Sequence, residues 1–176
     1  NKEKPIRAAT VRERLERSDL KITSLHAFFG PLYDPSETDE DLRQQAVENY
    51  AAEADFCREL GGRLLVVHPG DPFIGEETGD PERIQSLTRS AEQLAEMGER
   101  KEVVIALENL QPGQMGDDMA MLRRIVDRVD SPRLGINYDC GHANLNGDPV
   151  AIMEQAGPRI VGTHMEVAGV CAHAAM

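Results

Sequence analysis

The chain has 176 residues, of which 40% are hydrophobic and 28% charged, a composition typical of one soluble globular domain. No apolar run approaches the roughly 18 residues of a membrane span, and the N-terminal segment NKEKPIRAATVRERLE lacks the apolar core of a signal peptide, so we expect a cytoplasmic protein with no membrane partner. Acidic residues outnumber basic ones by 31 to 19, and the net charge of −12 disfavours nucleic acid as a partner.

Helical patterns alternate with short apolar runs along the chain. Amphipathic spacing indicates the helices, and runs rich in branched apolar residues indicate the strands. In chain order we expect helix 7–18, strand 21–26, helix 39–60, strand 63–68, helix 80–97, strand 103–108, helix 117–130, strand 134–139, helix 148–157 and strand 159–164. This alternation predicts a parallel sheet built from βα units.

Capping residues indicate where several of these helices begin and end. Asp80 and Asp148 are expected N-caps, because a proline follows each of them at the first helical position. Gly98 is the expected end of the helix that begins at residue 80, and Gly157 ends the one that begins at residue 148. Between residue 139 and the cap at Asp148 we expect a turn.

Each predicted strand ends in a side chain that can bind a metal ion: His26, His68, Glu108, Asp139 and His164. The carboxyl ends of parallel strands meet at one face of the protein, where ligands bind. An open doubly wound sheet uses mainly the crevice at its switch point, whereas all strand ends of a closed ring face one axis. The pattern therefore favours a TIM (β/α)8-type barrel, and no glycine-rich dinucleotide or phosphate motif points elsewhere.

Two carboxylates and a histidine form a mixed oxygen and nitrogen site, which suits Mn²⁺, Mg²⁺, Co²⁺ or Zn²⁺. The three cysteines are widely spaced and form no CxxC pair, which argues against a thiolate site. A divalent ion on a substrate carbonyl and the neighbouring hydroxyl would acidify the adjacent C–H. Glu108 is then the candidate ligand and base. For His26 and His68 a structural role is the alternative, in which their rings form hydrogen bonds with backbone groups of the loops.

Several segments together resemble the xylose isomerase-like TIM-barrel superfamily, which includes sugar-phosphate isomerases and epimerases as well as the endonuclease IV type of DNA-repair enzyme. These segments are ITSLHAFFGP, VVHPG, VVIALENL, LGINYDCGHANLNGDP and RIVGTH. The resemblance implies that Glu108, Asp139 and His164 bind the metal and that His142 contacts substrate oxygen and takes part in catalysis. It also implies that His26, His68 and Asn109 lie on the substrate side, where Asn109 anchors the loop after its strand. In the endonuclease branch, His26 and His68 would be ligands and His142 would bind a second metal.

The resemblance also predicts the extent of the barrel. Residues 1–164 correspond to strands two to six of eight, about five to six βα units, and residues 165–176 are expected to form a tail outside the barrel. A fourth ligand, which the family carries on strand eight, has no counterpart here. We therefore expect a fragment with uncovered sheet edges, which a homo-oligomer would cover.

The leading functional expectation is a divalent-metal-dependent isomerase or epimerase that transfers a proton next to the carbonyl of a sugar or sugar phosphate. The first alternative is an endonuclease IV-like zinc metallohydrolase, which His26 and His68 favour and the acidic charge disfavours. The second alternative is a catalytically inactive barrel segment that serves as an interaction module.

Overall fold

The structure, a computed structural model, describes residues 8–71 and 79–165 and arranges five strands of that part of the chain in one parallel sheet. The strands are β1 (Ser24–His26), β2 (Leu64–Val67), β3 (Val104–Glu108), β4 (Leu134–Asp139) and β5 (Ile160–His164). Their order in the sheet is β1-β2-β3-β4-β5, so every pair of neighbours is also consecutive in sequence. The order never reverses, as it would at the switch point of a doubly wound sheet.

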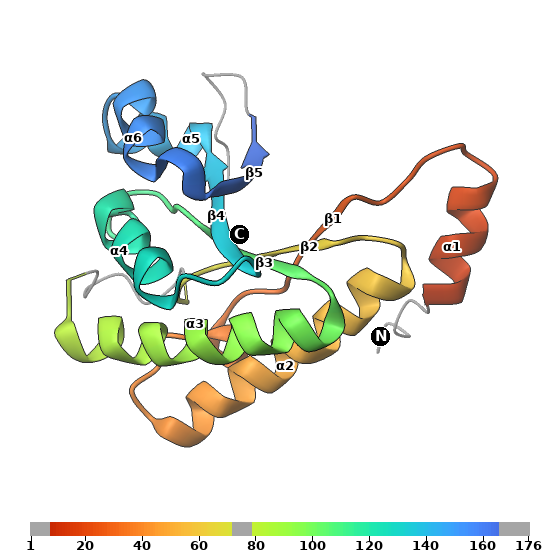
Figure 1. Cartoon of the computed structure of the whole chain (residues 1–176), viewed down its shortest axis with the longest axis horizontal. Helices are drawn as coiled ribbons and strands as arrows, with labels where there is room; N and C mark the ends of the chain where they lie inside the picture. The colour runs from red at the N-terminus through yellow and green to blue at the C-terminus, as the bar shows by residue number, and fades with distance from the viewer. Residues whose placement is uncertain (1–7, 72–78, 166–176) are drawn as a thin grey trace, which may run out of the picture.

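The helices are α1 (Ala8–Glu16), α2 (Glu40–Glu59), α3 (Pro81–Lys101), α4 (Met119–Val129), α5 (Cys140–Asn146) and α6 (Pro149–Ala156), with short 3-10 turns η1 (Pro31–Tyr33) and η2 (Gly157–Arg159). Helices α2, α3, α4 and α6 follow one another around the outside of the sheet, whereas α1 lies apart at one end of the molecule (Figure 1). Helix α2 packs on α3, α3 on α4, and α4 on α6. None of the helices within residues 8–71 and 79–165 is long and apolar enough to cross a membrane.

Contacts between non-neighbouring strands show that the sheet is strongly curved. Adjacent strands lie about 4.8 Å apart, so β2 and β5 would be about 14 Å apart in a flat sheet. A Cβ atom placed on Gly162 of β5 would nevertheless lie 2.7 Å from Leu64 Cδ2 of β2. The predicted partial TIM barrel is confirmed: five consecutive strands curl toward closure, with helices on the outside.

The core lies between the three central strands and the helices α2 to α4. Leu65, Ile105 and Ile136 from successive strands are fully buried, and Leu94 and Leu122 come from α3 and α4 to meet them. Burial on both faces explains why the central strands are near-continuous apolar runs.

Two local predictions were wrong. The expected turn after Asp139 is the helix α5, because the Asp139 side chain accepts a hydrogen bond from the backbone N–H of His142 (2.8 Å) and caps a helix there. Gly98 does not end α3, which continues to Lys101 and closes with Glu102 in the left-handed conformation. The chain turns back so tightly at this end that Val103 N–H donates to the Gly98 carbonyl (2.9 Å).

This close approach explains the glycine at position 98. A Cβ atom there would lie 2.6 Å from the carbonyl oxygen of Val103, a backbone atom that cannot move aside cheaply. We expect Gly98→Ala to lower the free energy of unfolding by about 1–3 kcal/mol despite the better helix propensity of alanine. Urea denaturation measures this change, and Gly79→Ala, where a Cβ meets nothing within 4 Å, is the control. Equal stabilities of the two variants would contradict the packing argument.

Candidate metal centre

The curvature brings the ends of strands that are far apart in the sheet to one place. The rings of His26 on β1 and His164 on β5 stack with centroids 5.7 Å apart and an interplanar angle of 22°. Four strand spacings would separate these residues by about 19 Å in a flat sheet. Glu108, at the end of the middle strand β3, lies between them.

Glu108 is the centre of the cluster, with a side chain that is only 2% exposed. Its Oε2 lies 2.9 Å from His26 Nε2 and 3.4 Å from His68 Nε2. Its Oε1 lies 2.5 Å from His164 Nδ1 and accepts a hydrogen bond from Asn137 Nδ2 (3.2 Å). Burial alone would raise the pKa of this carboxyl group, but the hydrogen bonds from the three histidines outweigh it and hold the pKa far below its ordinary value.

The two carboxylate oxygens of Glu108 therefore face two different sets of metal-binding atoms. We call His26, His68 and Glu108 the first ligand group, and Glu108, Asp139 and His164 the second ligand group; within each group the potential ligand atoms lie within 4.8 Å of one another. The second group is the set that the sequence assigns to the metal. The first group adds the two histidines that the sequence assigns to the substrate side.

The hydrogen bonds of His26 fit a metal ligand. Its Nδ1 lies 2.8 Å from the Ala27 carbonyl, which can only accept, so Nδ1 carries a proton and Nε2 faces Glu108. Metal-binding histidines usually donate their second ring N–H in this way. Burial lowers the pKa of His26, but the hydrogen bond and charge of Glu108 outweigh it, so the pKa is raised.

His68 differs from His26 because it is more deeply buried. Burial is the largest effect on its pKa and lowers it, although Glu108 acts in the opposite direction. The ring of Phe29 stacks on it, with centroids 4.7 Å apart and an interplanar angle of 9°. A neutral, shielded imidazole is the form that binds a metal ion.

Asp139 and His142 are held by Asn109. The Asn109 side chain accepts a hydrogen bond from the Asp139 backbone N–H (2.8 Å) and donates to the Asp139 carbonyl (3.0 Å), so one buried amide clasps both backbone groups. The backbone carbonyl of Asn109 accepts a hydrogen bond from His142 Nδ1 (2.9 Å), which leaves the lone pair of the His142 ring on Nε2. Asp139 Oδ2 lies 3.6 Å from His164 Nδ1. His142 belongs to neither ligand group and lies beside them, 3.7 Å from Asp139 Oδ1.

The sequence pattern did not single out Asn137 or Phe29. Asn137 is a polar residue inside the apolar run LGINYD, two positions before Asp139 and therefore on the same face of β4. In the sheet register it pairs with Glu108, which explains their hydrogen bond. A polar residue in phase with a predicted ligand is the signal that could have found it.

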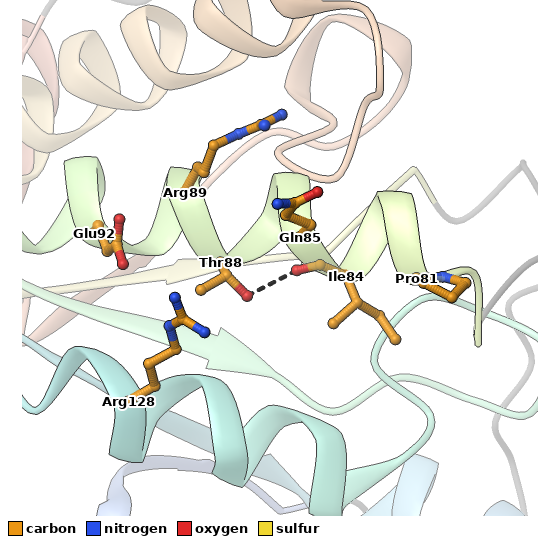
Figure 2. A pocket seen from close by; sticks show the side chains of 7 residues that line it. All are labelled: Pro81, Ile84, Gln85, Thr88, Arg89, Glu92 and Arg128. Atoms are coloured by element: carbon orange, nitrogen blue, oxygen red, sulfur yellow. Dashed lines mark hydrogen bonds between the residues drawn. The ribbon is translucent and has the colours of Figure 1, made fainter.

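An open groove of about 390 Å³ lies on the outer helical layer, between α3 and α4 (Figure 2). It is lined by Pro81, Ile84, Gln85, Thr88, Arg89, Glu92 and Arg128. None of these residues belongs to a strand end, so the groove is separate from the metal centre.

Comparisons with known proteins identify relatives of this chain. A probable endonuclease 4 from Thermotoga neapolitana is 34% identical over 121 residues, which are 67% of this chain and 40% of that protein. An uncharacterised protein of Methanocaldococcus jannaschii is 31% identical over 147 residues, 81% of this chain and 49% of that protein. The chain thus spans less than half the length of these two relatives.

Solved structures show the same fold. A D-tagatose 3-epimerase-like protein superposes with a TM-score of 0.81 and 28% identity, covering 92% of this chain and 62% of that one. An L-ribulose 3-epimerase superposes with a TM-score of 0.80 at 16% identity, over 90% of this chain and 55% of that one. The family profile described as xylose isomerase-like TIM barrel matches residues 1–168. The chain therefore belongs to the xylose isomerase-like TIM-barrel family, whose enzymes include sugar epimerases and endonuclease IV.

Proposed function

We propose that this protein is a hydrolase of phosphate esters that uses two divalent metal ions, of the same type as endonuclease IV. One observation carries the proposal: the buried carboxylate of Glu108 turns one oxygen to His26 and His68 and the other to His164. A single ion in the second ligand group would leave His26 and His68 to contact the substrate, whereas a second ion would use both of them as ligands. Pairs of divalent ions are common in phosphatases and nucleases. The similarity to probable endonuclease 4 proteins supports the same reaction class.

The ligand chemistry fits Zn²⁺ or Mn²⁺, since imidazole and carboxylate are both represented and thiolate is not. Ions bound there would polarise the phosphate ester and acidify the attacking water. Glu108 would hold both ions, so its oxygens are occupied and unsuited to proton transfer. His142 is the better general acid–base, because Asn109 fixes its Nδ1 proton and leaves Nε2 able to exchange one.

Metal affinity should fall as the pH is lowered. Protons compete with a metal ion for the imidazole of His26, and the hydrogen bond and charge of Glu108 raise the pKa of that imidazole against the effect of burial. We therefore expect affinity to rise with pH until it passes the raised pKa of His26 and then to level off. Zinc titrations between about pH 5.5 and 8.5, with the heat measured in two buffers of different ionisation enthalpy, report the affinity and the proton released. A zinc affinity that does not change with pH over this range would contradict the assignment of His26 as a ligand.

Activity distinguishes the reaction classes. The metal-loaded protein is incubated with a duplex that contains one abasic site and, separately, with ketohexoses. We expect incision of the duplex and loss of incision in Glu108→Gln. Epimerisation of a ketose without any incision would overturn the proposal.

A sugar isomerase or epimerase is the second candidate, and the charge of −12 favours it because a small neutral or singly charged substrate is not repelled as DNA is. The similarity to the D-tagatose 3-epimerase-like protein supports it as well. In that reaction the second ligand group would suffice, and Glu108 would be the base. Metal content then separates the two candidates, because ester hydrolysis should need an ion in each ligand group and epimerisation only one ion in the second group.

A further inference from the structure

A buried ion pair lies behind the metal centre, at the start of α3. Arg83 donates through Nη2 to Asp34 Oδ2 (2.7 Å) and to Ser36 Oγ (2.6 Å). The other oxygen of Asp34 accepts from the backbone N–H (2.8 Å) and the hydroxyl (2.7 Å) of Ser36. The exposed fractions of Arg83, Asp34 and Ser36 are 7%, 1% and 0%. We call these three residues the buried ion-pair cluster.

The cluster holds one end of the loop that follows His26. This loop is fixed at its start by the Ala27 N–H, which donates to the Val66 carbonyl of β2 (2.9 Å), and at its end by Asp34 in the cluster. Between these two points it carries Phe29, which stacks on His68. The position of the loop therefore affects both histidines of the first ligand group.

The cluster also touches the loop that follows His68. A Cβ atom on Gly70 would lie 2.9 Å from Ser36 Oγ, so the backbone two residues beyond His68 packs directly on the cluster. The glycine allows this contact, because any side chain would push the two loops apart. One cluster thus supports the loops of both histidines, whereas Asp139 in the second ligand group is held by Asn109.

The energetics of burial indicate that this cluster has a positioning role. Removing a charged pair from water costs several kcal/mol per ion, and replacing it by apolar side chains often leaves stability unchanged or improves it. Stability alone therefore gives little reason for an arginine and an aspartate here. A planar guanidinium that bonds two groups on one loop fixes the geometry of that loop more tightly than apolar packing does.

We propose that Arg83, with Asp34 and Ser36, is a positioning residue that sets the first ligand group, by fixing the loops that follow His26 and His68. This inference rests on the proposed two-ion function. It predicts that Arg83, which lies outside both ligand groups, controls the affinity of one ion and leaves the other unaffected.

The test is a calorimetric Zn²⁺ titration of the whole chain, with Co²⁺ absorption as a second measure of ligand geometry. In Arg83→Met we expect one of two ions to bind about 10–100-fold more weakly, as when an outer hydrogen-bond partner of a ligand is removed, with the other affinity unchanged. Arg83→Lys should restore part of the lost affinity, since an ammonium can still pair with Asp34 but lacks the fixed planar geometry of the guanidinium. Ser36→Ala should weaken the same ion, and it keeps the test decisive if Arg83→Met does not fold.

Arg123→Met is the control. Arg123 is a partly buried arginine that joins α4 to the end of α6, where it donates to the Ala156 carbonyl (2.9 Å), away from the loops that follow His26 and His68. Its loss should lower stability and leave both ions in place. Equal weakening in Arg123→Met and Arg83→Met, or unchanged binding in Arg83→Met and Ser36→Ala, would overturn the positioning role. If the unmodified chain binds fewer than two ions, the proposed function fails as well.

Discussion

Glu108→Gln is expected to remove both metal ions at once. The substitution keeps the size of the side chain but replaces the shared carboxylate by a neutral amide with one acceptor oxygen. Both ligand groups lose their only common member, so we expect each ion to bind more than about 100-fold more weakly. Elemental analysis after dialysis against metal-free buffer measures the loss, and it should be complete for both ions.

Glu102→Gln is the control for this experiment. It makes the same chemical change just before the opposite end of β3, where Glu102 pairs with Arg58 at the surface. Its metal content should equal that of the unmodified chain. Retention of one full ion in Glu108→Gln would show that the two groups do not depend on a shared carboxylate.

Asn109→Ala is expected to have the second largest effect, through the backbone of Asp139. The alanine leaves the Asp139 N–H and carbonyl without the amide that now satisfies both of them in a buried setting. Each of the two unsatisfied groups costs about 1–3 kcal/mol, so the free energy of unfolding should fall by about 2–6 kcal/mol. The second ligand group should lose its ion, and the first should keep it. Urea denaturation and zinc titration measure the two effects.

Asn109→Asp separates the two hydrogen bonds of this clasp. Aspartate can still accept from the Asp139 N–H, but it can no longer donate to the Asp139 carbonyl, and it adds a charge near Asp139. We expect this variant to be less stable than the unmodified chain. Its affinity for the ion in the second ligand group should differ from that of Asn109→Ala. If both variants keep full stability and both ions, Asn109 does not position Asp139.

The strands and their polar ends could be predicted from the sequence because both are local patterns. A strand buried on both faces needs a continuous apolar run, and LGINYD and VVIALE provide one. A charged or imidazole side chain that directly follows such a run is therefore expected at the carboxyl end of the sheet. The residues His26, His68, Glu108, Asp139 and His164 consequently meet in space as the parallel arrangement predicts.

The strand-end pattern predicted a curved sheet, and the resemblance offered His26 and His68 as ligands in the endonuclease branch, but neither could predict which oxygen of Glu108 each histidine would face. Only the curled sheet brings His26 and His164 to opposite oxygens of Glu108. The cluster around Arg83 was missed for a similar reason. Asp34 and Arg83 are 49 positions apart and follow no periodic pattern, so nothing in the sequence marks them as a buried pair.

Two ions that share Glu108 are the central claim, and manganese provides the most direct test. The chain is stripped of metal, loaded with Mn²⁺ and examined by elemental analysis and electron paramagnetic resonance. We predict two ions per chain and the broadened spectrum of two exchange-coupled Mn²⁺ ions. In Glu108→Gln the signal of bound Mn²⁺ should be lost. One ion per chain with the six-line spectrum of isolated Mn²⁺ would contradict the claim.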